Sequence, residues 1–434
     1  MSKRDAWVDA SFSEINDFSP QTVDPAKSPD ERFELYSVPA FPSGEPEFQL
    51  GSAIGSTKQL VLPGDVLVCK INPRINRVWA VTQQSGHRQI ASSEWIVMRP
   101  SGWNARYLRH YFSSPDFRDR IRDGVTGVGG SLARAQPKRV ATLDVPLAPL
   151  NEQKRIADKL DAVFARLDAC RERLDRMTAI VKHFRQSVLA ASASGKLTEE
   201  WAASQRADDW SSVSVHAIAT DVFDGPFGSH LMSKDYSSAG VRVVRLENIG
   251  RLRFVAEKET FIPRRKYETL RKHTLEAEDV LFSSFISEEV RVCLLPTALS
   301  KKAINKADCF CIRVDPSVCS PTFLAIRLAS RSTFLALERQ IHGATRPRIN
   351  LRQLKELTFD LPSLREQAEI VRRVDFLFAY ADRLEAHYTA ARAQVERLTP
   401  VLLAKAFRGE LAPQDPSDEP APVLLARIRA SRCS

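Results

Sequence analysis

Short segments of this 434-residue chain are rich in basic and amide side chains that could grip nucleic acid. Arg and Asn side chains match the edges of guanine and adenine in the major groove, and Lys neutralises phosphate. We therefore predict contacts with double-stranded DNA, although any one of these residues could be an ordinary solvated charge. The candidates in the first half are Lys70, Asn72, Arg74, Arg77, Arg88, Arg134 and Lys138. The candidates in the second half are Ser229, His230, Lys234, Arg245, Arg291, Arg346 and Arg348.

Residues with the spacing of a catalytic set are missing from the sequence. Residues 51–58 resemble a phosphate-binding loop, but the lysine follows the threonine instead of preceding it. The Glu-Gln-Lys at residues 152–154 could belong to a nuclease, yet the related Glu-Gln-Ala at residues 366–368 lacks the lysine. The eight histidines form no pair at metal-ligand spacing. We predict a binding protein, not an enzyme, with no metal and no cofactor of its own.

The overall charge permits a polyanionic partner without requiring one. Lys and Arg number 63 against 53 Asp and Glu, for a net charge of +10. Basic residues outnumber acidic ones by 18 to 16 in residues 1–148 and by 24 to 19 in residues 205–360. Seven cysteines, no secretory signal and no run of about 18 apolar residues predict a cytoplasmic protein with reduced thiols that does not enter a membrane.

The elements that would position the candidate residues are duplicated at one constant offset in the numbering. Leu-Asn-Glu-Gln at residues 150–153 recurs as Leu-Arg-Glu-Gln at residues 364–367, and Arg134 corresponds in the same way to Arg348. The distance from residue 150 to residue 364, which we call the repeat offset, also separates other matching residues. These matches predict a repeat without gaps from residue 65 to residue 197 of the first copy. Solenoids repeat every 20–50 residues, so this much longer offset indicates two copies of a larger unit.

Each copy ends in a long helical segment whose apolar residues alternate at steps of four and three. This spacing is typical of a coiled-coil seam, and about 40 residues give a helix of roughly 60 Å. The alternative is that each stripe packs against its adjoining domain. Asn151 is the expected N-cap of the first helix, Ser363 and Glu366 predict a capping box for the second, and Gly195 and Gly409 predict the ends. The predicted seam residues are Ile156, Leu160, Leu167, Leu174, Ile370, Val374, Leu377, Leu384 and Leu398.

The globular parts mix short β-type runs with helical runs, without the regular alternation of a doubly wound sheet. We predict an α+β (mixed α/β) fold in which two globular domains are separated by two long antiparallel coiled-coil helices related by a pseudo-two-fold. The expected boundaries are residues 1–148 and 205–360 for the domains, 149–197 and 361–412 for the helical regions, and 413–434 for a C-terminal tail.

Several motifs in this order point to one family. A Pro- and Leu-rich step leads into Leu-x-Glu-Gln in both copies, Gly-Pro-Phe-Gly-Ser stands at residues 225–229, and Gly-Glu-Leu stands at residues 409–411. The combination resembles the specificity subunit of Type I restriction–modification enzymes over nearly the whole chain. The first domain lacks Gly-Pro-Phe-Gly-Ser and begins its core at Tyr-Ser-Val-Pro, residues 36–39, and Ser363 replaces a second Pro. These departures indicate two different DNA targets.

The resemblance implies a division of labour. Each domain would be a target-recognition domain that reads one half of a split DNA sequence. The helices would set the spacer and dock methyltransferase subunits, expected to number two, with restriction/motor subunits bound through them. S-adenosylmethionine, ATP and Mg would bind those partners and not this chain.

Two other classes of function remain open at this stage. The chain could be a coiled-coil assembly scaffold whose globular heads bind protein, in which case its binding need not weaken with salt as phosphate contacts do. It could also be a fused modification–restriction enzyme, but this would require methyl-donor and nuclease motifs, which the sequence lacks.

Overall fold

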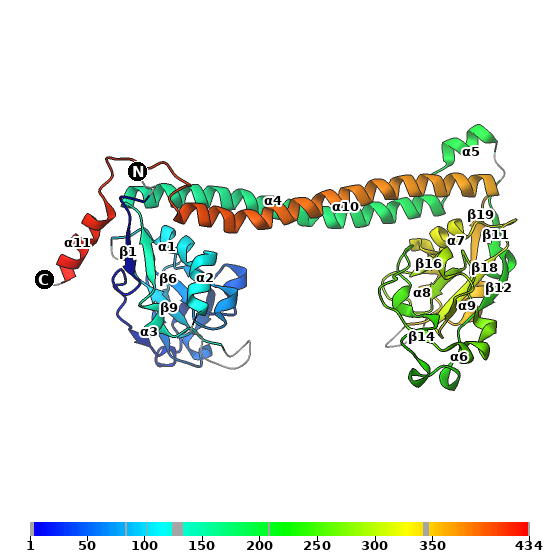
Figure 1. Cartoon of the computed structure of the whole chain (residues 1–434), viewed down its shortest axis with the longest axis horizontal. Helices are drawn as coiled ribbons and strands as arrows, with labels where there is room; N and C mark the ends of the chain where they lie inside the picture. Colours follow the sequence, from blue (N-terminus) through cyan, green and yellow to red (C-terminus); the bar gives the residue numbers. More distant parts are fainter. Residues whose placement is uncertain are drawn as a thin grey trace. The chain divides into compact units, whose positions relative to one another are not determined.

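The computed structural model describes residues 4–82, 85–100, 102–123, 133–206, 209–341 and 347–432. The chain divides into two compact units: Met1–Leu174 with Ala390–Ser434, and Asp175–Thr389. The long helices α4 (Leu150–Ala193) and α10 (Leu364–Phe407) have 44 residues each and contribute to both units (Figure 1). Each unit therefore contains one β-rich domain and one section of paired helix.

The domain of the first unit holds three sheets. Its five-stranded sheet has the order β2-β5-β8-β3-β4, its three-stranded sheet has the order β7-β6-β9, and β1 pairs with β10. The strands are β1 (Val8–Ser11), β2 (Thr22–Val23), β3 (Arg32–Tyr36), β4 (Glu47–Leu50), β5 (Lys58–Leu60), β6 (Val66–Cys69), β7 (Val78–Ala80), β8 (Arg88–Ala91), β9 (Trp95–Met98) and β10 (Asp144–Leu147). The other helices of this unit are α1 (Ala105–Phe112), α2 (Pro115–Arg122), α3 (Pro137–Val140) and α11 (Ala421–Arg432).

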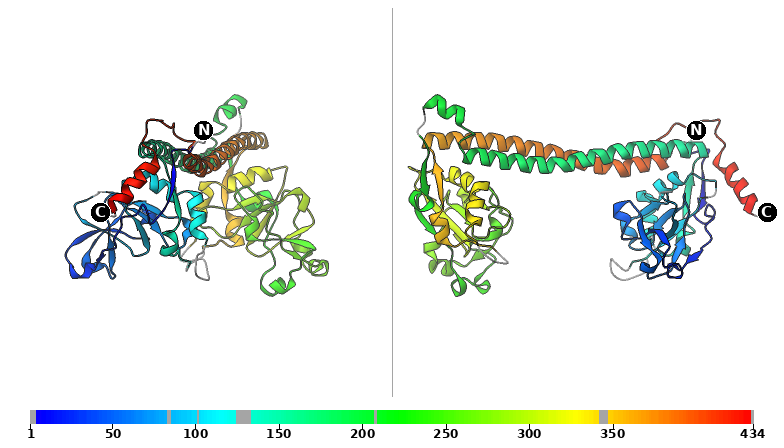
Figure 2. Two further views of the ribbon diagram at one scale, coloured as in Figure 1. Left: turned by 60° about the vertical axis from the view of Figure 1, so that its left-hand side comes forward. Right: turned by 180° about the vertical axis from the view of Figure 1, so that it is seen from behind.

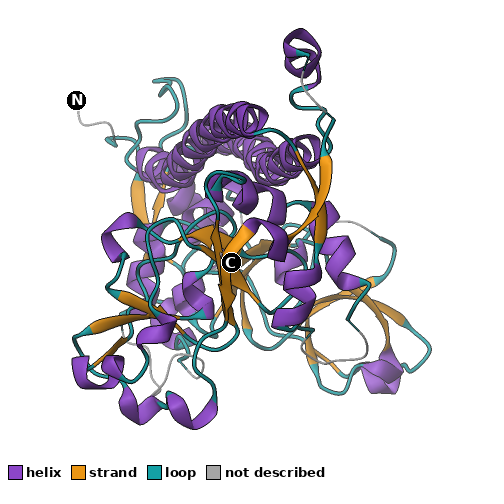
Figure 3. Ribbon diagram, turned by 90° about the vertical axis from the view of Figure 1, so that its right-hand side faces the viewer, coloured by secondary structure: helices purple, strands orange, loops and turns teal. Residues whose placement is uncertain are grey.

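The domain of the second unit has a related layout. Its sheets have the orders β12-β18-β15-β16, β14-β13-β17 and β11-β19. Figure 3 shows that helices and strands are mixed in the β-rich regions of the chain. The strands are β11 (Ser211–Ser214), β12 (Ala219–Phe223), β13 (Val241–Val244), β14 (Phe261–Ile262), β15 (Val280–Ser283), β16 (Val292–Leu294), β17 (Ala303–Asn305), β18 (Cys309–Val314) and β19 (Thr358–Leu361). The helices are α5 (Glu199–Gln205), α6 (Arg264–Glu268), α7 (Pro321–Leu328), α8 (Arg331–Glu338) and α9 (Leu351–Glu356). Together these elements confirm the predicted α+β class.

The two long helices lie side by side in the views of Figure 2. In the first unit Arg171 pairs with Glu396 (3.3 Å), and in the second unit Arg185 pairs with Glu385 (3.2 Å). Rising residue numbers in α4 meet falling numbers in α10, so the helices are antiparallel, as predicted.

Burial along the helices follows the four–three alternation except at Cys170, which is exposed, and near one proline. Of the predicted seam residues, Ile156, Leu160, Leu167, Ile370 and Val374 are buried, and Leu174, Leu377 and Leu384 are partly buried. Leu398 is 43% exposed, so its assignment to the seam is wrong. Thr399, the next residue, accepts a hydrogen bond from Arg171 instead (2.9 Å). Pro400 lies inside α10 and removes one backbone hydrogen bond there, and the buried positions continue at Leu403 and Ala406.

The helix ends depart from the sequence prediction in two details. α4 begins at Leu150, so Asn151 is no N-cap, and its amide donates to Asp418 instead (3.2 Å). The Ser363 hydroxyl accepts from the Glu366 N–H (3.4 Å), but the Glu366 carboxylate bonds elsewhere and does not close a capping box. Gly195 and Gly409 have φ of 75° and 74°, and this left-handed conformation is suited to ending a helix.

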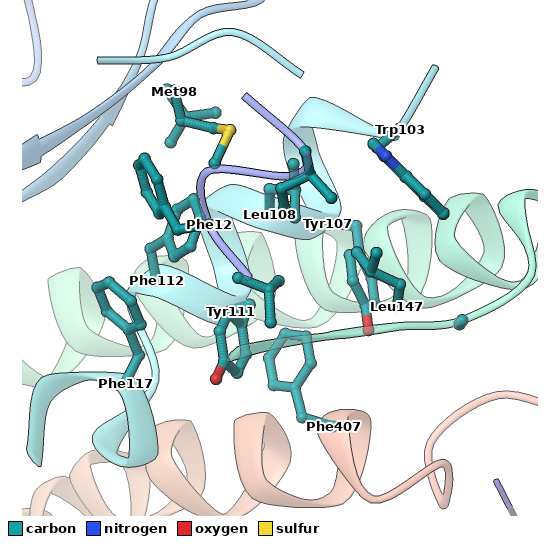
Figure 4. Packing of buried hydrophobic residues seen from close by; sticks show 14 of the residues in the cluster. Phe12, Met98, Trp103, Tyr107, Leu108, Tyr111, Phe112, Phe117, Leu147 and Phe407 are labelled. Atoms are coloured by element: carbon teal, nitrogen blue, oxygen red, sulfur yellow. The ribbon is translucent and has the colours of Figure 1, made fainter. Parts of the chain in front are cut away.

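The C-terminal segment is part of the core of the first unit. Phe407 of α10 packs edge-on against Tyr107 and Tyr111 of α1, with ring centroids 5.3 and 5.1 Å apart (Figure 4). Leu424 and Leu425 of α11 are buried in the same cluster. The predicted tail therefore includes a packed helix, a feature that its Pro-rich sequence did not reveal.

The repeat is not free of gaps. The backbone N–H of Asn104, the N-cap of α1, donates to Gln153 (3.0 Å), and that of Ser320, the N-cap of α7, donates to Gln367 (2.8 Å). The offset that carries Gln153 to Gln367 would carry Asn104 to Val318, yet the N-cap is Ser320. The predicted gap-free register is therefore wrong around α1 and α7, where the second copy has a short insertion before its helix.

Candidate nucleic-acid interface

Three separate chain segments meet at one place in the first domain, which we call the first junction. It comprises the β6–β7 loop (residues 70–77), Glu94 between β8 and β9, and residues 133–136. The loop and the third segment form a short antiparallel bridge, with Asn72 N donating to Ala133 O and Ala135 N donating to Lys70 O, both 2.8 Å. This bridge brings together five of the seven candidates of the first half, namely Lys70, Asn72, Arg74, Arg77 and Arg134.

The first junction is basic around a single carboxylate. Glu94 lies 3.4 Å from Arg134 and 3.9 Å from Lys70. Arg77 folds back and donates to the Ile71 carbonyl (3.3 Å). The Arg74 side chain is exposed and has no ion pair among the described residues. Because cations outnumber carboxylates here, the site is suited to a polyanion.

Two asparagines shape the loop that carries Arg74. Asn72 and Asn76 have φ of 45° and 49°, a left-handed conformation that asparagine tolerates better than most residues. Between them Pro73 begins a short 3-10 turn, and the Asn76 amide donates to the Phe112 carbonyl of α1 (2.9 Å). The loop is thus fixed by its own backbone and by α1, and Ile75 at its tip is 54% exposed.

An equivalent second junction exists in the second domain. It comprises the β15–β16 loop (residues 284–291), Asp308 and residues 347–350. Ile286 N donates to Pro347 O (3.0 Å), and Ile349 N donates to Ser284 O (2.9 Å). The residues in these two hydrogen bonds are the repeat equivalents of those in the bridge of the first junction. Two of the seven candidates of the second half, Arg291 and Arg348, lie at this junction.

The second junction differs from the first in its charges. Arg348 lies 3.7 Å from Asp308, as Arg134 lies near Glu94. Arg291 donates to Ser283 Oγ (3.0 Å) and to the Leu246 carbonyl (3.2 Å). The position of Arg74 is taken by Glu288, an acidic residue that could accept from a base amino group.

The Gly-Pro-Phe-Gly-Ser segment starts beside the second junction. Gly225 approaches the Lys306 backbone so closely that a Cβ would lie 2.1 Å from the Lys306 carbonyl carbon, so only glycine fits. Phe227, two residues later, is 58% exposed. Burial raises the pKa of the Asp224 carboxyl to about 6, and the nearby negative charge of Asp308 adds to the effect.

Replacement of Asp224 by Asn is expected to stabilise the chain at neutral pH. The folded-state pKa is raised, so the folded chain binds more protons than the unfolded chain, and the Asp224 contribution to stability falls as pH rises through about 6. After allowance for solvent screening, we expect a gain of about 1 kcal/mol at pH 8 that disappears near pH 4. Urea unfolding of parent and variant at both pH values measures it, and an equal difference at both would contradict the prediction.

The remaining candidates are not among the residues of the two junctions, and one of them lies outside the described residues. Arg88 pairs with Glu31 (2.7 Å) and lies over the Phe33 ring, so a structural contact occupies it. Arg245 pairs with Glu247 (3.2 Å). Arg346 lies outside the described residues. The candidates that are exposed and have no hydrogen-bonded or ion-paired side chain among the described residues are Lys138, Ser229, His230 and Lys234.

The repeated Leu-x-Glu-Gln motif joins each domain to its helix. Glu152 accepts from the Trp7 indole N–H (3.1 Å), and Glu366 accepts in the same way from Trp210 (3.0 Å). The Gln153 amide donates to the Ala148 carbonyl (2.8 Å). These bonds make the motif structural. The tryptophans were not identified from the sequence, because the repeat offset carries position 7 to position 221 and not to Trp210.

A second repeated pair was also missed. Arg99 forms two hydrogen bonds with Asp65 (2.8 and 2.7 Å), and Arg313 forms two with Asp279 (both 2.8 Å). Asp65 and Asp279 directly precede β6 and β15, so these pairs fix the start of the strands that lead into the two junctions. The sequence did offer a signal for this pair, because Arg99 and Arg313 are related by the same repeat offset as Asp65 and Asp279.

The described residues contain neither a metal-binding cluster nor a membrane-spanning helix. No group of three or more His, Cys, Asp and Glu side chains there could hold a metal ion. No helix within the described ranges is long and apolar enough to cross a membrane.

The sequence resembles known proteins over most of its length. Residues 271–391 match the family described as the Type I restriction modification DNA specificity domain. The chain is 32% identical over 353 residues to the Type I restriction enzyme StySPI specificity subunit of Salmonella potsdam, covering 77% of this chain and 74% of that protein. It is 30% identical over 341 residues to the EcoKI specificity subunit of Escherichia coli strain K12, covering 76% and 72%.

Solved structures share the fold. The HsdS subunit from Thermoanaerobacter tengcongensis is 21% identical, with a TM-score of 0.59 over 94% of this chain and 98% of that one. A chain from work described as the structural basis of complex assembly and conformational transition of the type I R-M system is 20% identical, with a TM-score of 0.72 over 93% and 98%. The likeness covers both β-rich regions and the paired helices.

Proposed function

Since this chain belongs to the family of Type I restriction–modification specificity subunits, we propose that it is a non-catalytic subunit that reads a bipartite DNA target. Each β-rich domain would read one half-site, with residues 1–148 and 205–360 as the two recognition domains. The observation that carries the proposal is the pair of equivalent junctions, each of which places an arginine, Arg134 or Arg348, beside one carboxylate.

The junctions combine a shared frame with different tips, and this supports reading of two different half-sites. Both junctions keep the backbone bridge to the loop, one acidic residue and two arginines. The acidic residue is Glu94 or Asp308, and the arginines are Arg77 and Arg134 or Arg291 and Arg348. The variable positions carry Lys70, Asn72 and Arg74 in the first domain but Ser284, Ile286 and Glu288 in the second. Ser284 and Ile286 are buried, so the exposed difference toward base edges is Arg74, a donor, against Glu288, an acceptor.

We assign the helices two roles, setting the spacer between half-sites and docking two methyltransferase subunits, through which restriction/motor subunits would bind. Phe376 and Tyr380 of α10 are 64% and 49% exposed and stand four residues apart, on one face of the helix. Exposed aromatic pairs of this kind are suited to a protein partner. S-adenosylmethionine, ATP and Mg would bind the partners, in the cytoplasm.

A competition experiment tests the function. The chain, assembled with its methyltransferase partner, should bind its bipartite target on the order of a thousandfold or more tighter than a duplex with shuffled half-sites. Both duplexes are measured at one salt concentration, because phosphate contacts make affinity salt-dependent. Equal affinity for the two duplexes would refute the proposed function. An affinity that does not change with salt would favour a protein-binding scaffold.

A further inference from the structure

A basic hollow of about 620 Å³ lies on the second domain, apart from the junction residues. Two segments that are well separated along the chain supply its charge, one around α6 and one just before β17. Four cationic side chains face one concave surface, which is suited to an anionic ligand. The lining residues are Gly240, Val241, Arg264, Tyr267, Arg271, Thr274, Lys301 and Lys302.

The positive charge of the hollow is only partly neutralised. Glu268 pairs with Arg264 (3.8 Å) and with Arg271, and the bond from Arg271 lowers the pKa of the Glu268 carboxyl, which stays ionised. Lys301 and Lys302 form no ion pair among the described residues. Four cations against one carboxylate leave a local charge of about +3.

The backbone fixes the two lysines before any ligand arrives. Lys301 N donates to Leu275 O (2.8 Å), and Lys302 O accepts from Arg242 N (3.0 Å), beside the parallel pairing of β13 with β17. Lys301 has φ of 56°, a left-handed conformation that costs free energy for a residue with a side chain. Strain of this kind persists where the surroundings enforce it, and here it places a cation on the wall of the hollow.

Among the described residues of the first domain, no equal charge lies at the matching place. Strand β8 pairs in parallel with β3 as β17 pairs with β13, so Lys301 and Lys302 correspond to His87 and Arg88. Arg88 is neutralised by Glu31 at 2.7 Å. The hollow therefore helps to explain why the basic excess is larger in residues 205–360 than in residues 1–148.

We propose that Arg264, Arg271, Lys301 and Lys302 bind backbone phosphates of DNA, and that the second domain therefore supplies the larger share of salt-dependent affinity. The inference rests on the proposed function and names a contact within it. Backbone contacts position a protein on DNA without reading its sequence. The hollow thus contributes affinity, and discrimination between targets is left to other residues.

The test uses the double variant Lys301→Gln/Lys302→Gln in the full chain with its methyltransferase partner. Affinity for the bipartite target is measured between 50 and 200 mM salt. Each lost phosphate contact lowers the slope of log affinity against log salt by roughly 0.9, so losing two makes the defect on the order of tenfold larger at 50 mM than at 200 mM. The matched control is Lys258→Gln, an exposed lysine of the same domain, which should keep the parent slope.

The duplex supplies a second readout. Replacing single phosphates by neutral methylphosphonates should weaken the parent at one or two linkages near one half-site, and these linkages should no longer matter in the double variant. An unchanged slope, or an unchanged methylphosphonate pattern, would overturn the inference. Loss of discrimination between target and shuffled duplex would overturn it as well, because the hollow would then read bases. A parent complex that does not discriminate refutes the proposed function, whereas the slopes on any duplex still test the hollow.

Discussion

Inserting one turn into both long helices is expected to make the protein bind a target with a longer spacer and unchanged half-sites. We place four residues after Met177 in α4 and four after Ala391 in α10, which are matching positions of the repeat. Both helices then lengthen by about 6 Å, which is under two base pairs of DNA. The original target should fall to the level of non-specific binding, a loss of on the order of a thousandfold or more.

Matched insertions matter because the two helices pair along their length. Arg171 with Glu396 and Arg185 with Glu385 mark the antiparallel register in each unit. An insertion in α4 alone would shift one seam against the other and should weaken binding to every spacer, which makes it the control. Selection of preferred sequences from a randomised duplex library reads out spacer and half-sites together. A changed half-site would show that the helices take part in base recognition. An unchanged preferred spacer would contradict the proposal that the helices set the spacer length.

Ending the chain after Ala412 is expected to unfold the first unit while the second unit keeps its structure. The deletion removes Leu424 and Leu425, which are buried against the domain, and Asp418, which pairs with Arg155 at 2.6 Å. Each buried aliphatic side chain contributes about 1.5–3 kcal/mol, and the loss of Asp418 from its pair with the partly exposed Arg155 costs about 2–3 kcal/mol. The sum is on the order of the total stability of a domain.

Hydrogen exchange monitored by mass spectrometry separates the two units in this experiment. Amides of β1 and α1 should exchange much faster in the truncated chain, and amides of β15 and β18 should not change. Asp418→Ala is an intermediate variant and should cost about 2–3 kcal/mol, because it leaves the Arg155 charge without its partner. Arg427→Gln breaks an exposed pair with Glu419 and should cost under about 0.5 kcal/mol. Parent-like protection of β1 after truncation would show that the C-terminal segment is not needed for the core.

The family and the fold class could be predicted from the sequence, and both predictions are confirmed. The helices could be predicted because a repeat of apolar residues is a local property that adjacent side chains express directly. The same reasoning failed at Leu398, where the following Pro400 alters the helix. It also overlooked α11, whose buried residues acquire a partner surface only when the chain folds back.

The candidate site was predictable in residue type but not in arrangement. Lys70 and Arg134 are predicted from their residue type, yet nothing in their spacing places both beside Glu94. Arg88 is predicted on the same grounds, but it pairs with Glu31, a residue 57 positions away in the chain. A single sequence gives the charge of each side chain, but the neighbours that neutralise or expose that charge come from strand pairing.

The sequence by itself determined the duplication, the two long helices and the family, because these depend on residue identity at regular intervals. Only the tertiary structure decided which segments meet. The bridge between residues 70–72 and 133–135, the hollow at Lys301 and the contact of α11 with the first domain all join residues far apart in the chain. Contacts of that kind are selected by the packing of the whole core and by the closure of its backbone hydrogen bonds, and local sequence does not encode them.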